Sequence, residues 1–158
     1  MLNTQSIYIR RRKRKEVETS ISHFSLHGLL PAGQTLALNI ETRTLSLLSE
    51  GPQLIMVQQL SANERYLIVP ILESFPHYCP YELLLSHISS ITVTEASITR
   101  CRQRLQEAQG YGRWQQELRP VRRALSSLRG KLHYFGLGIS NIRERGCSLT
   151  SLTSISHS

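Results

Sequence analysis

Apolar and polar residues alternate through residues 34–60, QTLALNIETRTLSLLSEGPQLIMVQQL. Leu36, Leu38 and Ile40 occupy every second position, Leu45 and Leu47 repeat the spacing, and a second apolar run follows at 54–57. A strand with one buried face shows this period of two, and Glu50-Gly51-Pro52 is a turn signal. The pattern predicts a small antiparallel sheet.

Helical spacing begins directly after this sheet. Ser61 and Glu64 fit a capping box ahead of an apolar pattern that runs to Phe75. Pro70 inside the pattern predicts a kink or a split, and Pro76 predicts the end of the helix. A short apolar helix is expected over residues 80–88.

Two arginine-rich helices are predicted in the second half of the chain. The first covers residues 94–109, with Thr94 as N-cap, and its basic side carries Arg100, Arg102 and Arg104. The second covers residues 119–133, with Pro120 in its first turn. We expect Trp114, in the connection, to anchor that connection onto the core; stacking on a base or a partner is the alternative.

The helix at 119–133 divides sharply into two sides. At 100° per residue, an apolar stripe gathers Val121, Ala124, Leu125, Leu128 and Leu132. The opposite arc holds Arg119, Arg122, Arg123, Ser126, Ser127, Arg129 and His133. A solvated helix usually pairs charges of both signs at i,i+4, whereas this arc contains no acid. After Gly136, two β-prone runs joined by RERG predict a hairpin with a basic tip.

The strongest indication of function is the positive charge of the chain and its distribution. The 158-residue chain carries a net charge of +8, with basic ends and a mildly acidic middle, and all but three of its 19 cations are arginine. The planar guanidinium suits phosphates and base edges, so polyanion binding leads the functional hypotheses. The N-terminal block, expected to be a flexible basic arm, comprises Arg10, Arg11, Arg12, Lys13, Arg14 and Lys15.

Several classes of function are disfavoured. The chain contains no aspartate, so it offers neither an aspartyl-phosphate acceptor nor a Ser-His-Asp triad. Its three cysteines lack CxxC spacing, its histidines lack metal-site spacing, and no phosphate-binding glycine loop appears. We therefore expect no enzyme, cofactor, metal or small-molecule substrate. No signal peptide or membrane span is evident, which favours a cytoplasmic, nucleoid-associated protein.

Four motifs carry a resemblance to a known family. They follow one another between residues 36 and 149. The motifs are LSANERYLIVPIL, PHYCPYELLLSHI, the frame Val121, Leu125, Leu128, Arg129 and Leu132, and GLGISNIRERGCSL. In this order they resemble the OmpR/PhoB-type winged helix-turn-helix DNA-binding domain, the effector module of bacterial response regulators. The chain departs from the family in the wing, where Glu144 replaces a glycine and Cys147 a tyrosine, and in a longer connection before the last helix.

The resemblance implies an α+β fold. We expect a leading antiparallel sheet, a three-helix core with an extra basic helix, and a C-terminal hairpin wing. The basic arm would span 1–20, the winged-helix domain 21–150 with the extra helix and connection at about 94–118, and a Ser/Thr-rich tail 151–158. No receiver domain is expected ahead of this module.

The resemblance also implies a function. The protein would be a bacterial transcriptional regulator that binds specific double-stranded DNA, with the helix at 119–133 in the major groove and the wing at 137–149 on the flanking backbone or minor groove. The expected contacts are Arg119, Arg122, Arg123, Ser126, Ser127, Arg129, Lys131, His133, Arg143 and Arg145. Expected further partners are RNA polymerase and a second protomer on the DNA.

Two alternatives stay open at this point. The helix at 94–109 also fits the arginine-rich frame of a reading helix, and its arginines, with the cations at 10–15, are secondary DNA-binding candidates. The helix at 119–133 is favoured because the wing follows it at once. The other alternative is a winged-helix adaptor that docks protein partners in a nucleoprotein or transcription assembly and binds DNA only non-specifically.

Overall fold

The structure, a computed structural model, describes residues 20–51 and 53–152. The expected arm therefore lies outside the described residues, apart from Ser20, and so do residues 153–158 of the expected tail. Among the described residues no helix combines the length and the apolar character needed to cross a bilayer.

A four-stranded antiparallel sheet comes first along the chain. Its strands are β1 (Ile21–Phe24), β2 (Thr35–Asn39), β3 (Thr44–Ser49) and β4 (Gln53–Gln59), paired in chain order. Leu36 lies opposite Leu47 and Leu38 opposite Leu45, and all four side chains are buried on one face. The predicted sheet over residues 34–60 is confirmed. Strand β1 was not predicted, because ISHF is too short to show a clear period.

Helix α3 (Ala62–Ser74) begins as the sequence predicts. The Glu64 N–H donates to Ser61 Oγ at 3.2 Å and the Ser61 N–H donates to Glu64 Oε1 at 2.7 Å, which completes the capping box. Pro70 does not split the helix. Proline has no N–H to donate to the carbonyl four residues earlier, that of Tyr66, yet α3 continues through this position to Ser74.

Four further elements follow α3 along the chain. They are the two-residue strand β5 (Cys79–Pro80), α4 (Tyr81–Ser89), α5 (Glu95–Gly110) and α6 (Trp114–Glu117). Thr94 caps α5 reciprocally with Ser97, as its position ahead of the helix predicts. The single turn α6 was not predicted, since four residues are too few to show helical periodicity.

Helix α7 (Arg119–His133) leads directly into a hairpin of β6 (Leu137–Ile142) and β7 (Gly146–Ser151). Strand β5 joins the hairpin along β7, which gives a second sheet in the order β5-β7-β6. Gly146 faces the backbone of β5 so closely that a Cβ there would lie 2.0 Å from the carbonyl oxygen of Cys79. The pairing of β5 with β7 therefore requires glycine at this position.

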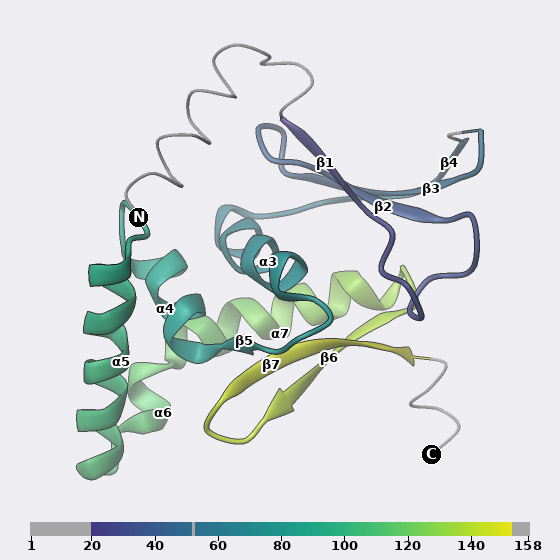
Figure 1. Cartoon of the computed structure of the whole chain (residues 1–158). Helices are drawn as coiled ribbons and strands as arrows, with labels where there is room; N and C mark the ends of the chain where they lie inside the picture. Colours follow the sequence, from purple (N-terminus) through teal and green to yellow (C-terminus); the bar gives the residue numbers. More distant parts are fainter. Residues whose placement is uncertain (1–19, 52, 153–158) are drawn as a thin grey trace.

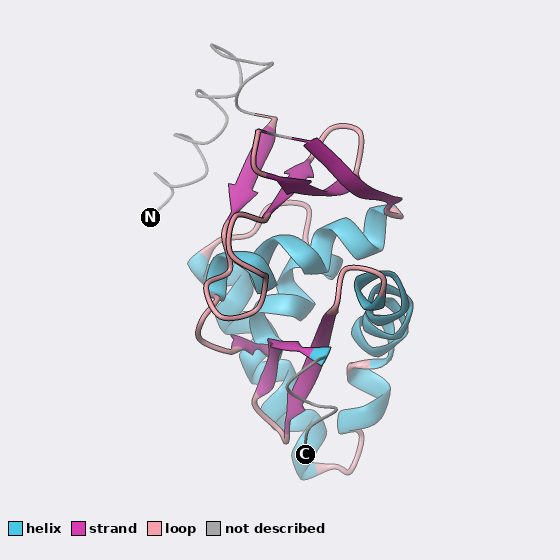
Figure 2. Ribbon diagram, turned by 90° about the vertical axis from the view of Figure 1, so that its right-hand side faces the viewer, coloured by secondary structure: helices cyan, strands magenta, loops and turns pink. Residues whose placement is uncertain are grey.

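The two sheets lie on opposite sides of the helices (Figures 1 and 2). Helix α3 lies between them and packs against α4 and α7, while α5 stands at the end away from the leading sheet and packs on α4 and α6 (Figure 1). Leu67, Ile68 and Ile71 of α3 are fully buried at the centre of the core. The molecule has a mixed α+β fold with antiparallel sheets, as expected.

Candidate functional site

The apolar stripe of α7 is buried as predicted. Val121, Leu128 and Leu132 have no exposed surface, and Ala124 and Leu125 are buried beside them. Because this side of the helix packs on α3 and α4, the opposite side faces solvent. The side chains of Arg119, Arg122, Arg123 and Ser126 are exposed there.

No acidic residue lies within α7. Among the described residues, the guanidinium groups of Arg119, Arg123 and Arg143 make neither a hydrogen bond nor an ion pair. Glu117, just ahead of the helix, is already bonded to Arg104. The outward side of α7 therefore keeps an uncompensated positive charge.

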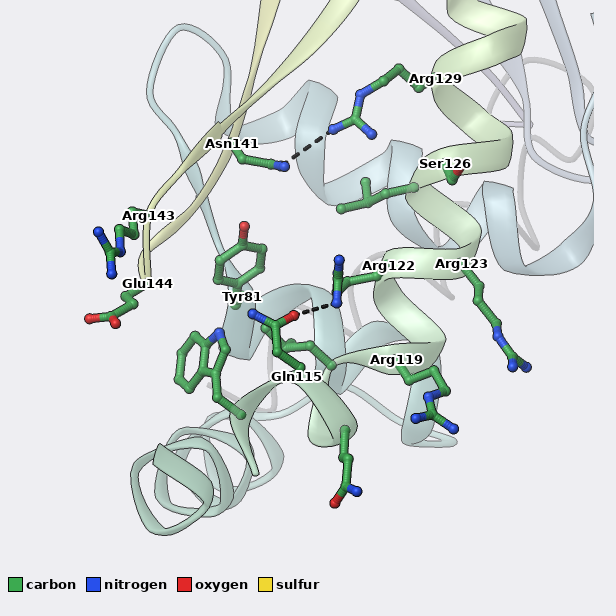
Figure 3. Close-up of a pocket in the computed structure, with 14 residues that line it drawn as sticks. Tyr81, Gln115, Arg119, Arg122, Arg123, Ser126, Arg129, Asn141, Arg143 and Glu144 are labelled. Atoms are coloured by element: carbon green, nitrogen blue, oxygen red, sulfur yellow. Dashed lines mark hydrogen bonds between the residues drawn. The ribbon is translucent and has the colours of Figure 1, made fainter. Parts of the chain in front are cut away.

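An open groove of about 730 Å³ separates α7 from the hairpin. Figure 3 shows α7 along one side, the hairpin along the other and α6 at one end. Tyr81 and Trp114 line its inner end and pack edge to face, with ring centroids 6.1 Å apart. The polar residues that line it are Gln115, Gln116, Arg119, Arg122, Arg123, Ser126, Arg129, Asn141, Arg143 and Glu144.

Two arginines point across this groove and are held in place. Arg122 donates through Nη1 to Gln115 Oε1, and Arg129 donates through Nε to the carbonyl of Ile139 at 3.3 Å and through Nη2 to Asn141 Oδ1 at 3.4 Å. Arg119 and Arg123 extend away from the aromatic pair instead (Figure 3). The groove is thus lined both by arginines that hydrogen bonds hold in place and by arginines whose guanidinium groups make no bond among the described residues.

Ser127 and Lys131 bond to α3 and to the end of β4 and do not line the groove, and their expected role as DNA contacts stays a prediction. The Ser127 hydroxyl donates to Glu64 Oε2, and Lys131 Nζ donates to Glu64 Oε1 at 2.8 Å and to the carbonyl of Gln59 at 2.6 Å. Both residues flank the apolar stripe. The sequence cannot show which flank meets a neighbouring helix, because that depends on where α3 lies.

Helix α5 presents a different electrostatic surface. Arg102 pairs with Glu82 at 3.2 Å, and Arg104 pairs with Glu117. Arg100 is exposed and makes no side-chain bond within the described residues. In Figure 1, α5 lies beyond α4, away from the hairpin. None of its arginines lines the groove beside α7.

The hairpin places its cations beside α7. Arg143 lines the groove, Arg145 is exposed at the turn, and His133 is exposed at the end of α7. Glu144 adopts a left-handed backbone with φ of 60°, a conformation that favours glycine. Cys147 is fully buried opposite Cys79 and does not reach the surface.

Sequence reasoning missed the polar end of the groove. Gln115 and Gln116 reach it only because α6 turns the chain back toward α7, and Asn141 reaches it from β6. Trp114 was the one available signal; it is half-buried and packs on the core, which confirms the anchoring role predicted for it. The cations at 10–15 lie outside the described residues.

No cluster of three or more histidine, cysteine or acidic side chains suited to a metal ion occurs in residues 20–51 and 53–152. Comparison with known proteins identifies no matching family model, no matching curated protein and no matching solved structure.

Proposed function

We propose that the chain is a winged-helix protein that binds specific sequences of double-stranded DNA, with α7 as the reading helix and the β6–β7 hairpin as the wing. The support is the order of elements: α3, α4 and α7 share one core, and the hairpin follows α7 directly and pairs with β5. This arrangement leaves the outward side of α7 and the hairpin on the same surface.

One observation carries the proposal. The exposed side of α7 combines three arginines with no acid, and the groove that these arginines line also contains Arg129 and Arg143. Neutralising DNA phosphates releases condensed counterions, which makes such a surface favourable for a duplex. A solvated helix with no ligand has no need to leave so many guanidinium groups uncompensated.

The geometry of the duplex divides these arginines into two groups. A major groove about 12 Å wide admits a helix, and a single sugar-phosphate strand separates it from the neighbouring minor groove. With α7 in the major groove and the hairpin at the minor groove, that strand would run through the groove between them. Arg122 and Arg129 would then contact phosphates, held ready by Gln115 and Asn141.

Base reading falls to the exposed side chains of α7 that make no hydrogen bond within the described residues. Arg119, Arg123 and Ser126 are exposed on the side of α7 that would face the base edges. A bidentate arginine–guanine pair contributes about 1–3 kcal/mol of discrimination between bases. Arg143 and Arg145 would add phosphate or minor-groove contacts from the hairpin, and His133 a contact at the end of α7.

Helix α5 is the weaker candidate for reading bases. Two of its three arginines are neutralised by glutamates, and the hairpin does not follow it. We assign it a structural role, as a brace between α4 and α6 that sets one end of the groove. The biological role that fits this assignment is transcriptional regulation in a bacterial cytoplasm, with RNA polymerase as a further partner.

Selection of bound sequences from a random duplex pool tests the proposal directly. We expect a defined motif for the full chain, and affinity that falls steeply between two salt concentrations. Replacing Arg119 and Arg123 together with alanine should relax the motif, whereas Arg100→Ala on α5 is the matched control and should leave it unchanged.

Two results would count against the proposal. Binding that is weak, blind to sequence and abolished by salt would favour the adaptor function instead. A motif that responds to Arg100→Ala and ignores the α7 substitutions would transfer the reading role to α5.

A further inference from the structure

The inner end of the groove between α7 and the hairpin is aromatic. Tyr81 is 8% exposed, and Trp114 is half-buried, with part of its ring packed on the core and part lining the groove. A sugar-phosphate strand is held mainly by cations, whereas aromatic surface in a nucleic-acid site stacks on a base. The groove therefore offers a contact that a phosphate backbone does not use.

The same groove is rich in hydrogen-bond donors and poor in acids. Gln115 Oε1 and Asn141 Oδ1 each accept from an arginine, so their amide NH₂ groups have no partner among the described residues. Five arginines line the groove, and Glu144 is the one acid among the lining residues. Guanidinium groups bind phosphate in a bidentate manner, so this surface suits a phosphorylated ligand.

Arg122 and Arg129 bring the cationic and aromatic parts together. Burial raises the pKa of Tyr81, while the charges of both arginines act to lower it, so both guanidinium groups lie near the tyrosine hydroxyl. Figure 3 shows Tyr81 facing the same space as these two arginines. A phosphate bound there would lie close to the aromatic pair.

From these features we propose that the groove binds a nucleotide, with its phosphates on Arg122 and Arg129 and its base against the exposed part of Trp114. The volume of about 730 Å³ is that of a small-ligand site, for which about 300–1,000 Å³ is typical. Inorganic phosphate would leave the aromatic end unused, and an uncharged aromatic compound would leave the guanidinium groups uncompensated. A nucleotide satisfies both parts.

Such a nucleotide would act as an effector of DNA binding. It would occupy the space proposed for a DNA strand and neutralise two of the cations that the strand needs. The chain contains no aspartate to accept a phosphoryl group, so a ligand in the groove supplies a different means of control. Only this competition rests on the proposed function; binding of the nucleotide itself does not.

Calorimetric titration of the full chain with ADP, without DNA, is the first test. Pyrophosphate and adenosine, which are the two parts of ADP, are the matched ligands. We expect pyrophosphate to bind at least about tenfold more weakly than ADP, because it lacks the base that would stack on Trp114. Adenosine should also bind more weakly, since it carries no charge. No binding of ADP overturns the inference, as does equal affinity for ADP and pyrophosphate.

Tryptophan fluorescence locates the bound ADP. Trp114 is the only tryptophan of the chain, so its emission should change saturably with the dissociation constant found by calorimetry. Arg122→Gln should weaken ADP binding. Arg100→Gln on α5 is the matched control, because Arg100 is also exposed and makes no side-chain bond within the described residues. Binding without a change in emission, or equal weakening by both substitutions, would place ADP outside the groove and overturn the inference.

Displacement of a labelled duplex tests the competition. At constant ionic strength, ADP should lower the affinity for the duplex more than the same concentration of pyrophosphate does. Unchanged duplex affinity in the presence of saturating ADP would overturn the effector role. Duplex binding without ADP tests the proposed function alone, and ADP binding without duplex tests the nucleotide site alone, so the two failures are distinguishable.

Discussion

Lys131 Nζ lies 2.8 Å from Oε1 of Glu64, a carboxylate with 1% of its surface exposed, and the contact joins the last turns of α7 to the first turn of α3. Burial raises the pKa of Glu64, but hydrogen bonds from Lys131, Ser127 and the Ser61 backbone outweigh burial and hold that pKa below its ordinary value of 4.5. The capping glutamate of one helix therefore orients the helix proposed to read DNA.

Replacing Lys131 with methionine tests whether this lysine stabilises the fold or contacts DNA. The variant keeps the stem of the side chain but leaves Glu64 short of a charged donor, so we expect the free energy of unfolding in denaturant to fall by about 1–3 kcal/mol. The salt dependence of DNA binding should stay unchanged. A decrease of about 0.9 in the log–log salt slope would instead identify Lys131 as a phosphate contact.

Two substitutions of Glu144, at the hairpin turn, should separate the effect of its backbone conformation on stability from the effect of its charge on DNA binding. Glu144→Gly relieves the left-handed backbone and removes a negative charge, so we expect stability to rise by up to about 1 kcal/mol and DNA affinity to rise as well. Glu144→Gln removes the charge but keeps the Cβ, so it should raise affinity alone. Thermal unfolding and duplex titration measure the two effects, and equal stabilisation by both variants would contradict the backbone argument.

Gly146 should tolerate no side chain. A Cβ there collides with the Cys79 carbonyl, so we expect Gly146→Ala to cost about 1–3 kcal/mol or more through separation of β5 from β7. The matched control is Gly130→Ala in α7, where nothing lies within 4 Å of the new methyl group and helix propensity predicts a gain of about 0.5–1 kcal/mol. Chemical denaturation of both variants checks the opposite signs.

His87 should make the free energy of unfolding depend on pH between 6.5 and about 4. Burial lowers the pKa of His87 from 6.5 to about 4, so the unfolded chain takes up a proton that the folded chain does not. The free energy of unfolding is therefore highest above pH 6.5 and decreases as the pH falls from 6.5 toward 4. We expect a loss of about 1–3 kcal/mol over this interval.

His87→Gln should flatten that part of the stability profile, measured by denaturant unfolding at several pH values. His133→Gln, which alters an exposed histidine at the end of α7, is the control for loss of a histidine. An unchanged slope in the His87 variant would assign the pH dependence to other groups.

The sequence by itself determined the elements whose causes are local. Capping residues fixed the starts of α3 and α5, alternation fixed the strands from 35 to 59, and the 3.6-residue period identified the buried stripe of α7. Each of these signals depends on residues within a few positions of one another, so no knowledge of the neighbouring elements is needed. Elements of two to four residues, such as β5 and α6, are too short to carry such a signal.

The tertiary structure decided which polar groups face each other. Arg122 and Arg129 point into the groove because Gln115 and Asn141 reach them from other elements, and Ser127 and Lys131 turn to Glu64, more than sixty positions away. A period along one helix separates buried from exposed sides, but it cannot say what approaches the exposed side. That outcome depends on packing between distant segments, which only the folded chain contains.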